Sequence, residues 1–271
     1  MTRDERRFGY GKHLLGALVS YAEREKTPVS SLVVGMKCGG SDGFSGITAN
    51  ALAGQLCDML TGMGASVILT EVPEMFGAEQ MLMDRCETPE VFDKMVRLIN
   101  GFKDYFRSHN QTVYENLSPG NKEGGISTLE DKSCGCVQKG GSAIVRGVYH
   151  YGERLPPDAK GLVLLEGPGN DIVSTTAMTA ADAHLILFTT GRGTPLGAPV
   201  PTHKIASNSA LARKKPAWID FDAGRMLSER ADAVRDELFQ LLLDVSNGTI
   251  ITRNELNNYR EIAIFKNGVT L

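Results

Sequence analysis

Four times along the chain, a short apolar run leads directly into a polar loop rich in glycine: LVVGMKCGGSDGFSG at 32–46, VILTEVPEMFGAE at 67–79, LVLLEGPGND at 162–171 and LILFTTGRGTP at 185–195. Short apolar runs that end at such turns are typical of strands buried inside a sheet. Together with a further apolar segment, they predict strands over residues 31–36, 66–70, 143–149, 162–166 and 185–190. Loops that follow parallel strands meet at one edge of the sheet, where α/β proteins bind their ligands.

Between these runs, apolar residues recur at the spacing of amphipathic helices. Helices are expected over 9–25, from Ser45 or Thr48 to Thr61, after EVPEMFGAEQMLM, from Pro89 to about Arg107, over 171–181, after Ser207 or Asn208, and over 229–246. The polar segment 109–128 is expected to be a functional or disordered loop. This alternation predicts an α/β fold: a largely parallel sheet with helices on both faces and a ligand site at the C-terminal ends of the strands.

The chain has 271 residues, of which 42% are hydrophobic, enough for one large domain or two small ones. The polar segment 149–161 allows two lobes, 1–148 and 162–271. A net charge of −3, with both signs interspersed, argues against nucleic acid and anionic membranes as partners. No apolar run reaches the roughly 18 residues of a membrane span, and the first residues do not resemble a secretory signal. We therefore expect a cytoplasmic protein that binds a small molecule.

The five cysteines are an odd number without the spacing of a disulfide framework: Cys38, Cys57, Cys86, Cys134 and Cys136. They indicate free thiols in a reducing compartment. Cys134 and Cys136 form a CxC pair that could bind a metal. The simpler interpretation is that Cys134 and Cys136 are buried like small apolar side chains. The same holds for Cys38 when this chain is considered alone.

The loop CGGSDGFSG places Ser41 and Asp42 directly after the first predicted strand. A helix that begins near Ser45 would direct free backbone N–H groups at this loop, and such groups can bind a carboxylate or a phosphate. Asp42 is also suited to a turn or a helix cap, and this is the more common role. The loop lacks the lysine of a phosphate-binding loop, and no GxGxxG follows a strand, so nucleotide binding is disfavoured.

The loop FTTGRGTP follows another buried strand and combines Thr189 and Thr190 with Arg192. An arginine fork flanked by hydroxyl groups suits a planar carboxylate. The alternative is a solvated arginine in a turn. In the Gly-flanked loop SPGNKEGG, Asn121 and Lys122 are the strong donors, and they face either a ligand or solvent.

Acidic residues follow the second predicted strand. Glu71 and Glu74 flank a proline in TEVPEMFG, so a rigid turn would hold two carboxylates at the same edge of the sheet as Asp42. Such oxygen ligands suit a divalent cation, Mn(II) or Fe(II), that keeps open positions for a substrate. An equally good interpretation is that Glu74 begins a helix and stabilises its positive end.

Six blocks of sequence, in order along nearly the whole chain, resemble the altronate and galactarate dehydratases, and the altronate branch most of all. The blocks are GMKCGGSDGFSGITAN, LTEVPEMFGAEQMLMDRC, YENLSPGNKEGGISTLEDKS, FTTGRGTPLGAPVPTHKIASNS, WIDFDAG and EIAIFKNGVTL. By this resemblance residues 1–271 are a C-terminal catalytic domain, and the family's N-terminal domains are absent. Ala51 and Cys134 depart from the family pattern, which usually has proline and leucine there.

The resemblance implies a metal-dependent dehydration of a sugar acid, from D-altronate to 2-dehydro-3-deoxy-D-gluconate. Abstraction of a proton alpha to a carboxylate creates an enediolate that cations must stabilise. We expect Lys122 or Lys204 as the base. Arg192 is expected to hold the substrate carboxylate. The expected metal is Fe(II) or Mn(II), held by Cys38, Asp42, Glu71 and Glu74. The expected substrate-binding residues are Ser41, Asp42, Ser45, Asn50, Asn121, Thr189, Thr190, Arg192 and Thr194.

Two other interpretations remain open at this point. The chain could be a non-catalytic or incomplete subunit that needs a separately encoded N-terminal half. It could also be a related lyase that acts on galactarate or sulfolactate. In each case we expect a homo-oligomer.

Overall fold

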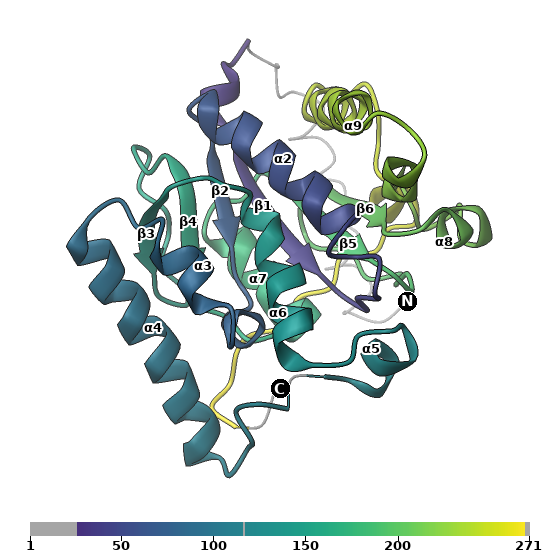
Figure 1. Ribbon diagram of the computed structural model, residues 1–271. Coiled ribbons are helices and arrows are strands. Elements are labelled where there is room, and N and C mark those ends of the chain that lie inside the picture. Colours follow the sequence, from purple (N-terminus) through teal and green to yellow (C-terminus); the bar gives the residue numbers. More distant parts are fainter. Residues whose placement is uncertain (1–25, 116, 269–271) are drawn as a thin grey trace, which may run out of the picture.

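The computed structural model of the protein describes residues 26–115 and 117–268, and its centre is one sheet of seven strands (Figure 1). The order across the sheet is β3-β4-β2-β1-β5-β6-β7, and every neighbouring pair is parallel. The predicted α/β fold is confirmed. The strands are β1 (Val33–Cys38), β2 (Ser66–Leu69), β3 (Val145–Tyr149), β4 (Gly161–Leu165), β5 (Leu185–Thr190), β6 (Thr202–Ala206) and β7 (Phe221–Asp222).

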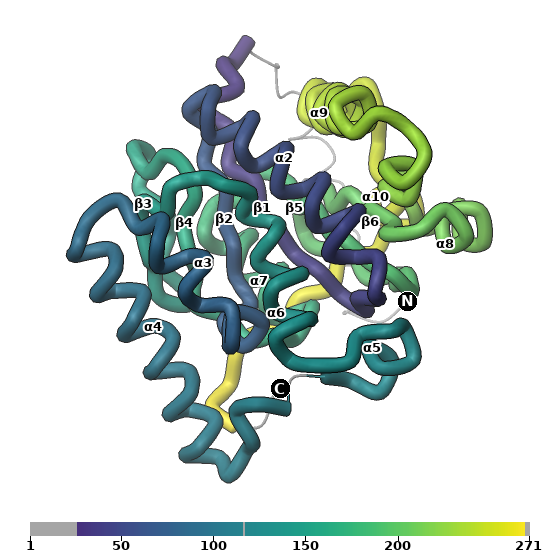
Figure 2. Tube along the Cα trace, in the orientation of Figure 1, coloured from purple at the N-terminus to yellow at the C-terminus, as the bar shows by residue number. Residues whose placement is uncertain are grey.

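Helices connect the strands and cover both faces of the sheet (Figure 2). The α-helices are α2 (Ala49–Gly62), α3 (Glu79–Met83), α4 (Pro89–Ser108), α5 (Pro119–Glu123), α6 (Leu129–Val137), α7 (Asp171–Ala180), α8 (Ser209–Lys214), α9 (Ala231–Ser246) and α10 (Arg253–Leu256). Short 3₁₀ helices are η1 (Val29–Ser31), η2 (Val72–Met75), η3 (Gln138–Gly140) and η4 (Ala223–Leu227).

Successive side chains of β1 point to opposite faces of the sheet, and the core is therefore divided into two clusters, one on each face. Val34 and Met36 point into the larger cluster, which α2, α4 and α9 complete. Gly35 faces the opposite side, where α7 contributes Met178 to a second cluster. A Cβ at Gly35 would lie only 2.7 Å from the Met178 sulfur, so glycine permits this close packing. Both faces of β1 are therefore buried, as its continuous apolar run indicated.

The predicted strands agree with β1 to β5 to within a few residues. β6 was missed because its sequence, THKIA, has the polar appearance of a loop although all five residues are buried. The helix expected after Ser207 or Asn208 is α8, and Asn208 caps it by accepting a hydrogen bond from the backbone N–H of Leu211. The loop expected over 109–128 contains α5, and α6 was not predicted at all. The helix expected over 9–25 lies outside the described residues.

Strands from the two ranges 1–148 and 162–271 share this one sheet, since β4 lies between β3 and β2, and β5 lies beside β1. The C-terminal ends of β1, β2 and β5 are therefore brought to one edge, where α6 and η2 also lie (Figure 1). In the part of the chain that the structure describes, no helix is both long and apolar enough to cross a bilayer.

Candidate metal centre

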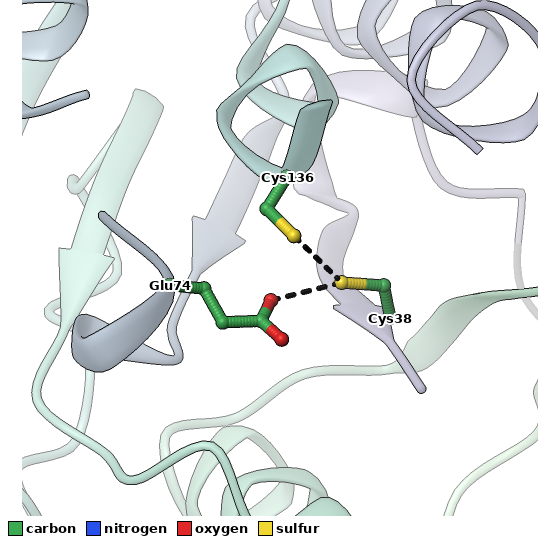
Figure 3. A group of neighbouring side chains, drawn as sticks. All are labelled: Cys38, Glu74 and Cys136. Atoms are coloured by element: carbon green, nitrogen blue, oxygen red, sulfur yellow. Dashed lines mark hydrogen bonds between the residues drawn. The ribbon is translucent and has the colours of Figure 1, made fainter. Parts of the chain in front are cut away.

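Three side chains from separate segments meet at the C-terminal edge of the sheet: Cys38, Glu74 and Cys136 (Figure 3). Cys38 is the last residue of β1, Glu74 lies in η2 after β2, and Cys136 lies in α6. One ligand atom of each lies within 4.8 Å of the others, and all three side chains are buried. The Cys38 sulfur is 2.9 Å from the Glu74 carboxylate and 3.5 Å from the Cys136 sulfur.

The backbone turns sharply after β2 to bring Glu74 to this position. Glu71 adopts a left-handed conformation (φ 68°, ψ 57°), which is uncommon for a residue with a side chain, and Pro73 then starts the 3₁₀ turn. Strained residues of this kind occur often at functional sites. Here the turn lets the Glu71 carboxylate accept the backbone N–H of Cys38 at 3.1 Å.

Buried lysines surround the two carboxylates. Lys139 lies 2.7 Å from the Cys38 sulfur, 3.2 Å from Glu71 and 3.5 Å from Glu74. Burial by itself would lower the pKa of Lys139. Attraction to the negative charges of Cys38, Glu71 and Glu74 outweighs this effect and holds the pKa of Lys139 well above its ordinary value. Burial similarly opposes ionisation of Glu74, yet Lys139, Lys132 and Lys37 lower its pKa below the ordinary range. The site therefore holds Glu74 as a carboxylate and Lys139 as an ammonium group.

A second ion-pair network lies directly behind the cysteine at the end of β1. Lys37 pairs with Glu71 and lies 2.9 Å from the carboxylate of Asp171 at the start of α7. Lys37 and Glu71 have no exposed side-chain surface, whereas Asp171 is 34% exposed. A buried pair of this kind loses much stability when one partner is removed, because the other charge is left unpaired. The network thus fixes the strand end that presents Cys38.

A cavity of about 640 Å³ opens at the same edge of the sheet. The three potential ligands Cys38, Glu74 and Cys136 are here called the metal group. The wall of the cavity includes two of them, Cys38 and Glu74. It also includes other polar side chains, among them Ser41, Asn121, Lys132 and Asp171. Lys132 lies 3.6 Å from Glu74, and its pKa is raised because Glu74 and nearby thiols outweigh the effect of burial. A cavity with a carboxylate, an ammonium group and amide and hydroxyl groups suits a small polyhydroxy acid.

Two thiols and a carboxylate form a donor set that fits a divalent transition metal such as Fe(II). The expected ligands Cys38 and Glu74 belong to this group. Glu71 lies close by, 3.8 Å from the Cys38 sulfur, but its oxygens bind Lys37, Lys139 and a backbone N–H. The group of potential ligands found among the described residues does not include Glu71 or Asp42.

Asp42 is held by three donors from other segments. Its carboxylate accepts hydrogen bonds from Ser45 at 2.8 Å, from Ser207 at 2.8 Å and from Asn208 at 3.0 Å. Asp42 and Ser45 line a smaller cavity of about 200 Å³ next to the metal group. These contacts join the loop after β1 to the end of β6, and binding of metal or substrate by Asp42 and Ser45 stays a prediction.

Thr189, Thr190 and Arg192 lie beside this loop but do not line the larger cavity. The Thr189 hydroxyl donates to Asn50 at 2.5 Å, and the Thr190 hydroxyl accepts backbone N–H groups of its own loop. The exposed Arg192 side chain lies on α5, where a Cβ at Gly120 would be 1.4 Å from a guanidinium nitrogen. A role of these residues and Asn50 in substrate binding stays a prediction.

Neither of the two lysines expected to act as the base lines the cavity. Lys122 is exposed on α5. Lys204 is buried, which lowers its pKa to about 8, and its ammonium group donates to two backbone carbonyls, including that of Thr194 at 3.0 Å. Asn121 does line the cavity, and its amide binds the carbonyl of Ser41 at 2.9 Å.

Sequence reasoning missed Cys136 as a ligand, as well as Lys37, Lys132 and Lys139 around it. The CxC pair was the available signal for Cys136, but it did not distinguish this buried thiol from the exposed Cys134. The sequence around the three lysines gave no indication that they are buried, because lysine side chains are usually exposed and a buried lysine cannot be distinguished from a solvated one by its neighbours in sequence.

Comparison with known proteins gives a consistent result. The family described as D-galactarate/altronate dehydratase, C-terminal, matches residues 29–270. Altronate dehydratases of Escherichia coli and Bacillus subtilis are 53% and 54% identical over 96% and 92% of this chain, and over 52% and 50% of their own lengths. The (2R)-sulfolactate sulfo-lyase subunit beta of Chromohalobacter salexigens is 30% identical over 91% of this chain and 65% of its own length. The chain thus spans about half the length of the altronate dehydratases, and it belongs to the D-galactarate/altronate dehydratase family.

Proposed function

We propose that this chain is the catalytic C-terminal region of a cytoplasmic sugar-acid dehydratase that converts D-altronate to 2-dehydro-3-deoxy-D-gluconate and water. The observation that carries the proposal is the buried group Cys38, Glu74 and Cys136, of which Cys38 and Glu74 line a cavity at the C-terminal ends of the strands. Membership of the dehydratase family supports the reaction type. Identity above 50% to two altronate dehydratases supports altronate as the substrate.

The reaction needs positive charge close to the substrate carboxylate, because removal of the C2 proton concentrates negative charge on that group. A divalent cation held by Cys38, Glu74 and Cys136 would supply Lewis-acid stabilisation. The two sulfur ligands favour Fe(II) over Mn(II), which prefers oxygen ligands. The chain adds its own cation, since Lys132 lines the cavity and is kept protonated by Glu74.

The base must reach the cavity and carry an available lone pair. Asp171 meets both conditions: its carboxylate lines the cavity, is 34% exposed and is held by Lys37 at 2.9 Å. We propose that Asp171 removes the C2 proton and that this proton then passes to the C3 hydroxyl, which leaves as water, so that the enol that remains tautomerises to the 2-keto acid. Lys132 then binds the substrate carboxylate. Under this assignment Arg192 acts at the rim, from its position on α5, rather than at the reacting carbons.

A second interpretation is supported by the length of the match. The chain spans about half of the altronate dehydratases, and one relative is described as a subunit. An N-terminal half encoded separately would then complete the site, and the homo-oligomer that we expect would be built from such pairs. Galactarate and sulfolactate are the alternative substrates.

The test is an assay of the purified chain with Fe(II), in which D-altronate, galactarate and sulfolactate are compared by detection of their products. We expect the 2-keto acid from altronate, and its loss in Asp171→Asn and Lys132→Met. Arg192→Ala should raise KM more than it lowers kcat. Product that forms only after addition of an N-terminal half from an altronate dehydratase would support the split enzyme. If no altronate product forms under either condition, the proposed function is wrong.

A further inference from the structure

The segment after α10 crosses the molecule as an extended chain. Residues 261–268, here called the strap, belong to the block EIAIFKNGVTL, to which the proposed chemistry gives no role. The part-buried residues Glu261, Ala263 and Phe265 alternate with exposed ones, so one face of the strap lies against the protein. In Figure 2 the strap, drawn in yellow, runs from the side of α10 past α7 toward α4.

Four backbone N–H groups of the strap donate to four different parts of the chain. That of Glu261 donates to the carbonyl of Gly197 at 2.9 Å, and the Glu261 carboxylate accepts the N–H of Gly197 at 2.8 Å. The strap thereby joins the loop between β5 and β6 to α7, to the loop between β3 and β4 and to α4. The other three N–H groups donate to side-chain hydroxyls: Ala263 to Thr176 at 3.1 Å, Phe265 to Tyr151 at 2.8 Å and Gly268 to Tyr105 at 3.0 Å.

Two of these contacts lie next to residues of the cavity wall. Leu196 directly precedes Gly197, and Phe106 directly follows Tyr105. Both Leu196 and Phe106 line the cavity at the C-terminal ends of the strands. The ring of Phe265 also packs against that of Tyr105, with centroids 5.4 Å apart. The strap therefore connects two walls of the cavity, which the chain supplies from distant segments.

The contact with α7 reaches a third wall. The Thr176 hydroxyl, which accepts the N–H of Ala263, donates to the carbonyl of Ile172 at 2.7 Å. Ile172 lines the cavity next to Asp171, the proposed base. The carboxylate of Asp171 is held separately, by Lys37 at 2.9 Å. Loss of the strap contacts should thus move the walls of the cavity more than it moves the base.

Successive N–H groups of an extended segment have a fixed spacing, so the groups that accept from them must keep a matching spacing. We propose that the strap sets the width of the cavity, because it holds the loop between β5 and β6, the start of α7 and the end of α4 at fixed positions. Tyr105, Thr176 and Glu261 are then positioning residues, which act on a substrate through the cavity wall. This inference rests on the proposed function, since it takes the cavity to be the substrate site.

The triple variant Tyr105→Phe/Tyr151→Phe/Thr176→Val tests the proposal, because it removes the three hydroxyl acceptors and nearly keeps the size of the side chains. With D-altronate, under the condition that gives product, we expect KM to rise at least about fivefold and kcat to change less than about twofold. A smaller folded fraction alone would lower kcat and leave KM unchanged. Thr179→Val is the matched control on α7, since the Thr179 hydroxyl donates to the carbonyl of Thr175 within that helix, and both constants should stay unchanged.

Hydrogen–deuterium exchange gives a measurement that does not depend on the reaction. In the triple variant, the amides of residues 106–115, 171–173 and 194–198 should exchange at least about tenfold faster, while those of β1 and β5 stay protected. An unchanged KM would overturn the proposal, and so would unchanged exchange in these three segments. Faster exchange in β1 and β5 as well would mean that the strap stabilises the whole fold, which also contradicts the proposal. If the unmodified chain forms no product under any condition, the proposed function is wrong, and the exchange rates alone decide whether the strap holds the walls.

Discussion

At the scale of single residues, the metal group distinguishes two cysteines that are two positions apart. Cys136 is buried within the group, whereas Cys134 is exposed on the same helix. Cys136→Ser should weaken Fe(II) binding by roughly 100-fold or more, because a thiolate ligand is lost. Cys134→Ser should leave Fe(II) affinity unchanged. Titration of both variants with Fe(II) under anaerobic conditions checks this, and equal affinities would remove Cys136 from the ligand set.

Another residue-scale consequence concerns His203 on β6. It is fully buried, and neither ring nitrogen has a hydrogen-bond partner among the described residues. Burial lowers its pKa from 6.5 to about 4. The unfolded chain therefore takes up this proton near pH 6.5 and the folded chain only near pH 4. The stability that neutral His203 provides is complete above pH 6.5 and is lost as the pH falls toward 4, by about 3 kcal/mol.

We expect His203→Leu to remove this part of the acid sensitivity and to raise the free energy of unfolding at pH 7 by about 1 kcal/mol, because an unpaired buried polar group is eliminated. Urea unfolding at pH 7, 6, 5 and 4 measures both effects. His150→Asn is the control, since His150 is largely exposed. Parallel pH profiles for His203→Leu and the unmodified chain would contradict the assignment.

At the scale of elements, the close contact between α2 and η3 at Gln138 fixes the segment that carries Cys136 and Lys139. A Cβ at Gly54 in α2 would lie 2.1 Å from the backbone oxygen of Gln138. Gly54→Ala should therefore force the two elements apart, with a loss of about 2 kcal/mol in the free energy of unfolding and weaker Fe(II) binding.

Gly101→Ala provides the matched control for this element-scale prediction. Gly101 is exposed within α4, and a Cβ there meets nothing within 4 Å. Alanine is the better helix former, so this variant should gain roughly 0.5–1 kcal/mol. Urea unfolding and Fe(II) titration of both variants decide the matter. Similar stabilities for the two would mean that α2 and η3 are not held by close backbone packing.

At the scale of the whole molecule, metal binding and folding should be coupled. The potential ligands come from β1, η2 and α6, so they meet only in the folded chain. Fe(II) at a hundred times its dissociation constant should stabilise the chain by about 2.7 kcal/mol. Calorimetry with Fe(II) and then with a chelator should show a rise and a reversal of Tm, both absent in Cys136→Ser. A Tm that Fe(II) does not change would argue against a site assembled by the fold.

Much of this architecture could be predicted because it depends on local patterns. The apolar runs at 31–36 and 185–190 are strands in the structure, and the polar residues after them lie at one edge of the sheet. Cys38 and Glu74 could be selected in advance, since each follows a strand end. β6 could not, because Lys204 and His203 are buried there against the usual preference of their side chains.

The amino-acid sequence alone determined the α/β class, the family and two of the three potential metal ligands. Only the tertiary structure decided that Cys136, 98 residues from Cys38 along the chain, lies 3.5 Å from its sulfur and that Lys139 lies between the sulfur and the carboxylates. The reason is physical. A strand or helix follows from interactions between near neighbours, whereas contacts between side chains distant in sequence depend on strand order and on how closely α6 and η3 pack against α2.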